Sequence, residues 1–210
     1  AAPQGYYRWK DDTGNEHFLV FNGPDGSLMA VWTQSSYEGA GDHRIVFSRS
    51  DDEGVTWAPP RRIAGPARPG DGYMASWGFP LMSRSGRIYV LWNQYQGIDD
   101  VIHQHTGTMD CAYSDDLGRT WTTPVTLPMP RSPHDDPDPK VPSNWIVWQL
   151  PIRDLAGKWF AGFSRWVSKA VRTPPINNSW TAWETVVEFM RFENIDDDPP
   201  PQDLAITYSA

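Results

Sequence analysis

The sequence has a single cysteine, Cys111, and lacks any apolar stretch long enough to cross a membrane as a helix. One thiol excludes an internal disulfide framework, and its position in an apolar run predicts a buried side chain. Basic residues are scarce: 18 Lys and Arg stand against 26 Asp and Glu, which gives a net charge of −8. This negative charge, together with the lack of a glycine-rich phosphate loop, argues against nucleic acid. We therefore expect neither a nucleic acid nor a membrane as the partner.

A helical apolar period of useful length is also missing, whereas alternating apolar runs are frequent. The chain has 12 Trp, 20 Pro and 17 Gly, and only 21% of its residues are charged. This composition is typical of a folded, loop-rich β protein rather than a disordered chain.

A repeated motif organises the sequence. The segments "SRSDDEGVTW" (48–57) and "AYSDDLGRTW" (112–121) share the pattern Ser-Asp-Asp-x-Gly-x-Thr-Trp. Upstream of them, "GSLMAVWTQ" (26–34) corresponds to "GRIYVLWNQ" (86–94), and a third version, "GKWFAGFSRW" (157–166), carries Arg165 where the others have glutamine. Repetition at a period above about forty residues indicates a radial or solenoidal repeat architecture.

Each repeat contains four apolar runs separated by turn residues, which predicts four antiparallel strands and no helix. The pattern is that of a β-propeller blade, so we predict an all-β propeller domain over 1–210 with blades at about 17–63, 78–127 and 145–190. Known propellers close with roughly 4 to 8 blades. We therefore expect about three blades of a six- or seven-bladed propeller, with the remainder supplied elsewhere.

The aspartates of the repeated motif fall in the hairpin between the third and fourth strands of a blade. There a carboxylate can accept backbone N–H bonds, a glycine can supply positive φ, and a tryptophan can pack between blades. Because the motif occurs in equivalent copies, we predict a structural role for its residues. They are Ser50, Asp52, Gly54 and Trp57 in the first copy, and Ser114, Asp116, Gly118 and Trp121 in the second.

The pattern Ser-x-Asp-x-Gly-x-Thr-Trp resembles the Asp-box of the sialidase-like, or BNR-repeat, propellers. The resemblance implies that these hairpins lie on the rim opposite the ligand-binding face. A third copy, around "NNSWTAWE", keeps the Trp and lacks the Asp-Gly pair. Ligands are therefore expected among the loops between second and third strands and the crossovers between blades.

One of these loops, 95–109, carries His103 and His105. In an extended segment, a His-x-His pair points both rings to one side, which suits a general base or a metal site. The alternative is a pair of histidines in a solvated loop. The two crossovers add aromatic and amide candidates for substrate binding, namely Tyr73, Trp77, Asn144 and Trp145.

The second crossover is rich in carboxylates. Asp135, Asp136 and Asp138 offer the oxygen ligands that calcium prefers, although no complete calcium-loop motif is present. A solvated, proline-rich loop is the alternative. At the end of its strand, Arg165 is suited to bidentate binding of a substrate carboxylate, or else to an ion pair between blades.

The family resemblance implies a sialidase first, but the Phe/Tyr-Arg-Ile-Pro segment of sialidases does not occur in the sequence. The segment "SNWIVWQLPIRDLAGKWFAGFSRW", taken with "HQHTGTM", is similar to the rhamnose-glucuronate lyases and related rhamnosidases. That similarity implies β-elimination at a uronate, with His105 as base beside His103 and with Arg165 neutralising the carboxylate. A sialidase or other glycosidase and a non-catalytic glycan-binding propeller are the alternatives.

The expected partner in each case is an oligosaccharide or polysaccharide. No cofactor is required, and a calcium ion is an option. The small-residue start "AAPQG" is compatible with a cleaved signal or with an arbitrary boundary. A glycan substrate suggests a secreted, extracellular protein.

Overall fold

The computed structural model describes residues 14–173 and 184–209, which form three antiparallel sheets and two short 3₁₀ helices. The first sheet contains β1 (Gly14–Asn22), β2 (Leu28–Ser35), β3 (Arg44–Ser50) and β4 (Arg61–Ala64). The second contains β5 (Ala75–Met82), β6 (Ile88–Tyr95), β7 (Gly107–Ser114) and β8 (Val125–Leu127). The third contains β9 (Asn144–Ile146), β10 (Ile152–Arg153), β11 (Trp159–Trp166), β12 (Thr185–Phe192) and β13 (Ile206–Tyr208). Between β12 and β13 lie η2 (Ile195–Asp197) and η3 (Pro201–Asp203).

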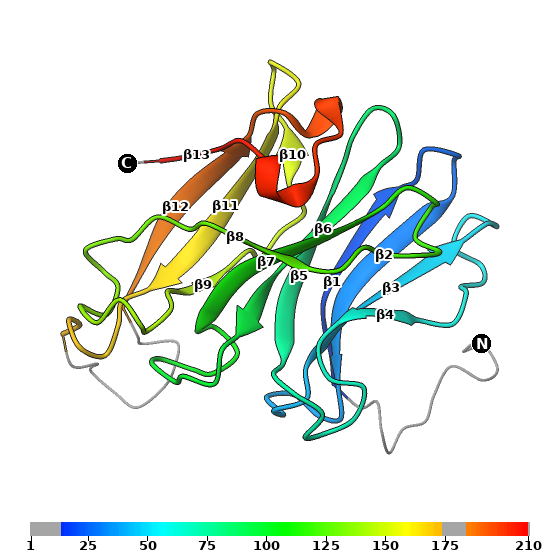
Figure 1. Ribbon diagram of the computed structural model, residues 1–210. Helices are drawn as coiled ribbons and strands as arrows, with labels where there is room; N and C mark the ends of the chain where they lie inside the picture. The colour runs from blue at the N-terminus through cyan, green and yellow to red at the C-terminus, as the bar shows by residue number, and fades with distance from the viewer. Residues whose placement is uncertain (1–13, 174–183, 210) are drawn as a thin grey trace.

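Successive strands pair in chain order in the first two sheets, as expected for propeller blades. Figure 1 shows the three sheets side by side, with their hairpin turns at one end and their longer loops at the other. No sheet closes on itself within the described residues. The fold is therefore all-β and propeller-like.

The third sheet departs from the prediction. By analogy with the other repeats, the segment "AWETVVEF" (182–189), which follows the third motif, should be the fourth strand of its blade. Instead, β12 pairs along its whole length with β11 and is the third strand in the order. The fourth is β13, which pairs with the end of β12, so the sheet extends to Tyr208 rather than ending near residue 190. Its first strand is split into β9 and β10, which both pair with β11. The degenerate third motif at "NNSWTAWE" lies mostly outside the described residues.

Alternating side chains fill the two spaces between the sheets, because successive residues of a strand face opposite sides. The core between the first and second sheets includes Met29, Val31, Ile45, Phe47, Ile88, Val90, Trp92 and Ala112. The core between the second and third includes Phe79, Leu81, Tyr89, Leu91, Cys111, Trp145, Phe163, Met190 and Phe192. The thiol of Cys111 is buried, as the sequence predicts, and burial raises its pKa.

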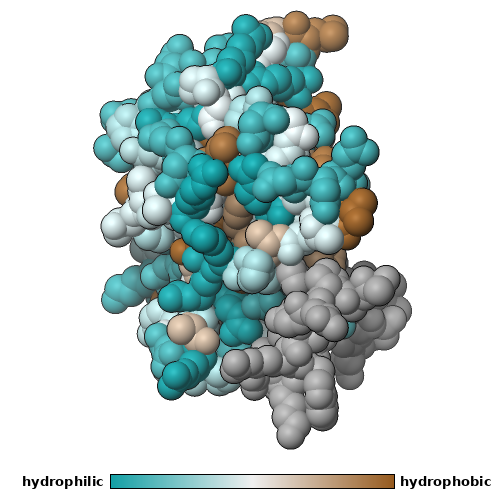
Figure 2. All heavy atoms as spheres, turned by 90° about the vertical axis from the view of Figure 1, so that its right-hand side faces the viewer, coloured by the Kyte–Doolittle hydropathy of each residue, from teal (hydrophilic) through white to brown (hydrophobic). Residues whose placement is uncertain are grey.

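The outward face of the third sheet is apolar and open. Phe160 and Phe189 stack there with ring centroids 5.3 Å apart. In the strand register, Phe160 corresponds to Tyr89 and Phe189 to Cys111 of the second sheet. Tyr89 and Cys111 are buried against the third sheet. On the side of the first sheet, Figure 2 shows a mostly hydrophilic surface with scattered hydrophobic residues.

The Asp-box hairpins have the same hydrogen bonds in both copies. The Asp52 carboxylate accepts bonds from the Thr56 amide at 2.8 Å and the Thr56 hydroxyl at 2.6 Å, and Ser50 Oγ accepts one from the Gly54 amide at 2.9 Å. In the second hairpin Asp116 binds Thr120 in the same way, at 2.8 and 2.6 Å. This geometry is the turn-holding arrangement that the sequence suggested.

The tryptophans of the two hairpins differ in their packing. Trp121 packs against Phe47 of the first sheet, with ring centroids 5.4 Å apart, and so lies between two sheets. Trp57 instead packs on Ala30, Trp32 and Val46 of its own sheet.

Two ends of the sheets can now be defined. Arg87 in the turn after β5 pairs with Asp115 of the second hairpin, so this turn and the Asp-box lie at the same end. We call this end the Asp-box face (turns 23–27 and 83–87, hairpins 51–60 and 115–124). The loop face is the opposite end, with loops 36–43 and 96–106 and crossovers 65–74 and 128–143.

Candidate functional site

A cavity of about 380 Å³, which we call the His105 cavity, opens on the loop face, where side chains from all three sheets meet. Its lining residues are Glu16, His17, Glu38, Trp77, Ile102, Gln104, His105 and Trp148. They come from the starts of β1 and β5, from two loops and from the segment after β9. The cavity therefore depends on the relative placement of the sheets.

Two β-bulges at equivalent positions shape the cavity. The β1–β2 register shifts between Glu16 and Leu19, and the β5–β6 register shifts between Ser76 and Phe79. In each bulge one large residue has left-handed backbone geometry: His17 at φ 58° and Trp77 at φ 61°. Such geometry is uncommon for bulky residues, and bulges beside active sites often redirect a side chain. Here both affected side chains line the cavity.

Aromatic rings form the walls. The Trp77 ring lies 5.5 Å from Trp148, 5.7 Å from His105 and 5.6 Å from His17, measured between centroids. Its indole nitrogen donates to the Gln104 carbonyl at 2.8 Å, which fixes the ring. Tryptophan faces at such an opening are suited to stacking on a sugar ring.

His105 is 2% exposed, and its imidazole packs on Trp166 at a centroid distance of 4.3 Å. Burial lowers the pKa of His105 to about 3, and His103 and His43 add to the effect. The ring is therefore neutral at neutral pH. An imidazole with so low a pKa is a weak base, which counts against abstraction of a C5 proton from a uronate.

Several polar atoms at this cavity have no hydrogen-bond partner in the described part of the chain. They are Glu16 Oε1, Gln104 Oε1, His105 Nδ1 and both ring nitrogens of His17. The backbone of Val147 and Trp148 lies near enough to His17 to offset part of its pKa drop, which burial takes to about 4. Buried polar atoms are normally satisfied, so their concentration in one cavity points to a polar ligand or ordered water.

Glu16 is the ionisable group best suited to proton transfer. Its half-buried position raises the pKa of its carboxyl, the nearby Glu38 adds to the rise, and the Gly39 backbone opposes it. Behind it, His43 Nε2 lies 3.8 Å from Glu16 Oε1, while His43 Nδ1 lies 3.0 Å from Ser76 Oγ. Burial lowers the pKa of His43 to about 4, so this imidazole contributes no positive charge at neutral pH.

The structure gives the two histidines that we expected to act together different surroundings. The amides of His105 and Thr106 both donate to the Ile102 carbonyl, at 2.9 and 3.1 Å, so the segment is a turn rather than an extended strand. His105 lines the cavity, whereas His103 packs near Tyr95, at 6.3 Å between ring centroids. The segment is therefore not extended, as the prediction assumed, and of the two histidines only His105 lines the cavity. The catalytic role of His105 remains a prediction.

The predicted substrate-binding residues divide in the same way. Trp77 lines the cavity, but Tyr73 does not and packs against Tyr95. Asn144 and Trp145 are fully buried. Asn144 binds Thr106 Oγ1 and the Asp100 carboxylate, both at 2.6 Å, and Trp145 Nε1 donates to the Gly107 carbonyl at 3.0 Å. These two residues anchor loop 96–106 and offer no surface to a substrate.

Arg165 requires a correction. Its side chain is buried rather than open to a substrate, with Nε and Nη2 donating to the Glu188 carboxylate at 2.7 and 2.9 Å. Nη1 donates to Asp135 at 2.9 Å. The guanidinium is thus held by two carboxylates of the protein, and it does not line the His105 cavity.

The three crossover aspartates do not gather into a shared site. Asp135 is buried and binds Arg165, while Asp136 Oδ1 accepts from the Asp138 amide at 2.8 Å and Asp138 Oδ1 from the Lys140 amide at 2.9 Å. Across residues 14–173 and 184–209, no group of three or more His, Cys, Asp or Glu side chains is arranged to hold a metal. These three carboxylates are therefore not arranged as one site for the calcium ion that the sequence offered as an option.

The site residues predicted from the sequence did not include Glu16, His17, Glu38 or Trp148. We predicted that the first blade starts at residue 17, but β1 begins at Gly14. The repeat could have revealed them, because Glu16 and His17 occupy the same positions at the start of their strand as Ser76 and Trp77 in the second repeat.

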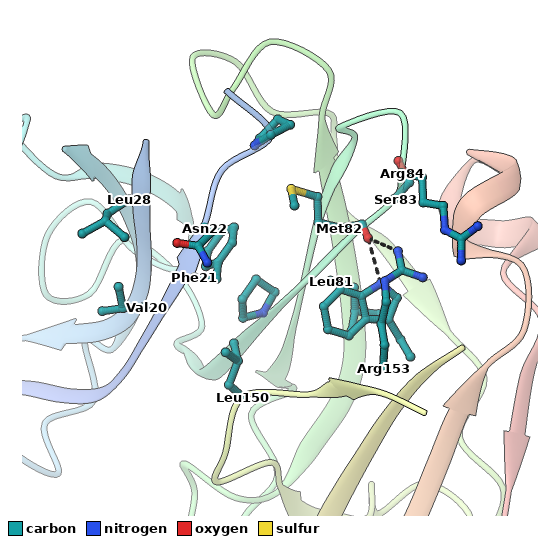
Figure 3. Close-up of a pocket in the computed structure, with 13 residues that line it drawn as sticks. Val20, Phe21, Asn22, Leu28, Leu81, Met82, Ser83, Arg84, Leu150 and Arg153 are labelled. Carbon is teal, nitrogen blue, oxygen red and sulfur yellow. Dashed lines mark hydrogen bonds between the residues drawn. The ribbon is translucent and has the colours of Figure 1, made fainter. Parts of the chain in front are cut away.

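A larger cavity, of about 590 Å³, lies on the Asp-box face. Its main charged group, Arg153, is already paired within the protein. Figure 3 shows Arg153 directed at the Met82 carbonyl, and Arg153 also pairs with Asp196 at 2.7 Å. Most other lining residues are apolar, including Val20, Phe21, Leu28, Leu81 and Leu150. Neither Asp52 nor Asp116 lines this cavity or the His105 cavity.

Side-by-side antiparallel sheets with Asp-box hairpins define the class of this protein as a propeller-like repeat domain. Residues 26–191 match the family described as BNR repeat-like domain. The match covers more than half of the chain, so the protein belongs to this family. No curated protein matches the chain. None of the helices in the described residues is long and apolar enough to cross a membrane.

Solved structures with a similar fold include several glycan-active enzymes. The Hadza microbial sialidase Hz136 is 19% identical, with a TM-score of 0.61, over 87% of this chain and 36% of the sialidase. Trypanosoma rangeli sialidase in complex with the inhibitor DANA is 13% identical, with a TM-score of 0.57, over 94% and 31%. An endo-1,4-beta-xylanase from Bacteroides thetaiotaomicron is 14% identical, with a TM-score of 0.53, over 93% and 58%. The chain thus spans about a third of either sialidase, and the likeness shows the fold alone.

Proposed function

We propose that this protein acts on a glycan in the His105 cavity and that the reaction is glycoside hydrolysis. The observation that carries the proposal is the meeting of Glu16, whose pKa is raised, with a second carboxylate, Glu38, in one cavity walled by Trp77 and Trp148. Glycoside hydrolases generally use two carboxyl groups that flank the scissile bond, one of them protonated. The fold shared with sialidases and a xylanase supports the same class of substrate.

In this proposal Glu16 is the general acid that protonates the leaving oxygen, because its carboxyl keeps a proton to higher pH than usual. Glu38, which is exposed on loop 36–43, is the second carboxylate. His17, Gln104 and His105 bind hydroxyl groups through their unpaired atoms. Trp77 and Trp148 stack on the sugar.

Elimination at a rhamnose-glucuronate linkage is the second candidate, on the strength of the sequence similarity given above. It needs a cation beside the uronate carboxylate and a base for the C5 proton. Arg165 is bound to Glu188 and Asp135, and the low pKa of His105 makes it a weak base. Hydrolysis, which needs neither group, is therefore favoured. We also propose that the protein is secreted, because a glycan substrate suggests an extracellular location.

The test is incubation of the purified protein with a panel of glycans, followed by two measurements. Hydrolysis releases reducing ends, whereas elimination also produces an unsaturated uronate that absorbs in the near ultraviolet. We expect new reducing ends without the chromophore, and a loss of at least about 10²-fold in turnover in Glu16→Gln. Glu53→Gln, on the Asp-box face, is the matched control and should keep full activity. Binding without turnover of any glycan would identify a binding module instead.

A further inference from the structure

The charges of the His105 cavity bear on which sugar it takes. Its described lining contains two carboxylates, Glu16 and Glu38, and neither Lys nor Arg. Its two histidines, His17 and His105, are kept neutral at neutral pH by burial. Among the described residues the lining therefore offers no cation, and its negative charge comes from Glu38, joined by Glu16 when that carboxyl is ionised.

The arginine that sequence reasoning assigned to a substrate carboxylate is unavailable. All three nitrogens of the Arg165 guanidinium donate to protein oxygens, on Glu188, Asp135 and the Pro130 carbonyl. A carboxylate taken out of water without a cation pays a desolvation penalty of several kcal/mol. A substrate carboxylate would in addition meet the negative charge of Glu38.

The unpaired atoms indicate what the ligand must supply. Glu16 Oε1 and Gln104 Oε1 are acceptors that lack donors within the described residues, and the neutral His17 ring adds one donor and one acceptor nitrogen that are also unpaired there, a mixture that a hydroxyl group can satisfy because it both donates and accepts. Sugar hydroxyl groups donate hydrogen bonds, whereas an ionised carboxylate only accepts them. The π faces of Trp77 and Trp148 carry partial negative charge, so they favour the C–H face of a sugar over an anion.

We propose that the cavity takes a neutral sugar ring and rejects a ring that carries a carboxylate. This inference rests on the proposed function and deepens it by naming the substrate class. It separates this site from those that hold sialic or uronic acids, although the fold is shared with sialidases.

The experiment compares acidic oligosaccharides with their own carboxyl-reduced forms, in which –COO⁻ becomes –CH₂OH and nothing else changes. Three series serve as probes: rhamnose-glucuronate, galacturonate and sialyl-lactose oligosaccharides. Binding to the protein is measured by calorimetry at neutral pH. In the series that binds, we expect the reduced form to bind at least about tenfold more tightly than the acid.

Two variants place the effect in the cavity. Glu38→Gln should narrow the ratio of the two affinities by strengthening binding of the acid. Asp71→Asn, which removes another exposed carboxylate, in crossover 65–74 and outside the lining, should leave the ratio unchanged. Equal or tighter binding of the acidic form would overturn the inference while leaving the proposed glycan site intact. Failure of every probe, acidic and reduced, to bind would overturn both.

Discussion

Gly118, in the second Asp-box hairpin, lies directly against the ring of Phe47 in the first sheet. A Cβ atom built on Gly118 would approach Phe47 Cε1 to 2.1 Å, and the residue has φ 79°. The hairpin therefore joins two sheets as well as two strands, which gives the repeated motif a role in assembling the repeats.

The equivalent glycine of the first hairpin allows a matched comparison. Gly54 has φ 88°, but its added Cβ would meet only the flexible Leu28 Cδ1, at 3.3 Å. We expect Gly54→Ala to cost about 1–2 kcal/mol through backbone strain. Gly118→Ala should cost about 1–3 kcal/mol more, because the rigid ring of Phe47 must move. Urea unfolding of both variants measures the difference, and equal losses would show that the contact between sheets is unimportant.

Arg165 provides a second stability prediction. Arg165→Met would leave the buried Asp135 and the partly buried Glu188 without their shared cation. We expect a loss of about 3–5 kcal/mol in the free energy of unfolding. The control is Arg84→Met, whose side chain is 74% exposed and pairs with Asp196, and which should cost less than about 1 kcal/mol. A small loss at Arg165 with selective damage to binding of an acidic sugar would restore the original assignment to substrate.

These two sites show what the sequence can predict. The Asp-box was recognisable because its hydrogen bonds run between residues two to four positions apart, so its geometry is encoded locally. The environment of Arg165 could not be recognised from the sequence, because its partners lie 30 residues before it and 23 residues after it. The strand pattern around Arg165 is the same whether the arginine binds a substrate or is buried in an ion pair, so it cannot distinguish the two.

The cavity illustrates the same limit. The strands and the loop that carries His105 follow from alternation and turn residues, but the positions of His17 and Trp77 depend on bulges that shift the register of β1 and β5. Alternation also predicts that His103 and His105 share a side, but it does not apply to this segment, because a turn closes on the Ile102 carbonyl. The cavity forms only where the three sheets meet, and no local sequence pattern predicts how the sheets pack together.

The buried histidines predict a pH dependence of stability. The pKa of His105 falls from 6.5 to about 3 in the folded state, and those of His17 and His43 fall to about 4. Because the unfolded chain binds more protons, their contribution is fully present above about pH 6.5 and is lost as the pH falls toward 3–4. Glu16 acts in the opposite direction: its raised pKa stabilises the fold at low pH, and this contribution is lost as the pH rises through the folded pKa.

The histidine effect amounts to at most about 1.4 kcal/mol per pH unit for each residue. His105→Gln should therefore flatten the decline in urea midpoint between pH 6.5 and 4. The same substitution at His134, in crossover 128–143, is the control. A decline as steep in His105→Gln as in the unchanged protein would rule out His105 as a source of acid sensitivity.

The open face of the third sheet can be tested by two phenylalanines on one strand. Phe192 is fully buried, whereas Phe189, on the opposite face of β12, is 41% exposed. We expect Phe192→Ala to cost about 3–5 kcal/mol and Phe189→Ala about 1 kcal/mol. If both variants lose stability equally, the outward face is covered in solution, and sedimentation would show whether a second copy covers it.

The last prediction concerns catalysis by the two histidines of loop 96–106. Each histidine has one unpaired ring nitrogen, His105 Nδ1 and His103 Nε2, but only His105 lines the cavity. We expect His105→Ala to reduce kcat on the glycan identified above by at least about 10²-fold, and His103→Ala to reduce it far less. Circular dichroism and urea unfolding confirm that each variant is folded. Since burial keeps His105 neutral, His105→Asn, which retains a polar group for hydroxyl binding, should recover part of the activity if the residue orients the sugar. No recovery in His105→Asn, with KM unchanged, would instead assign His105 to proton transfer.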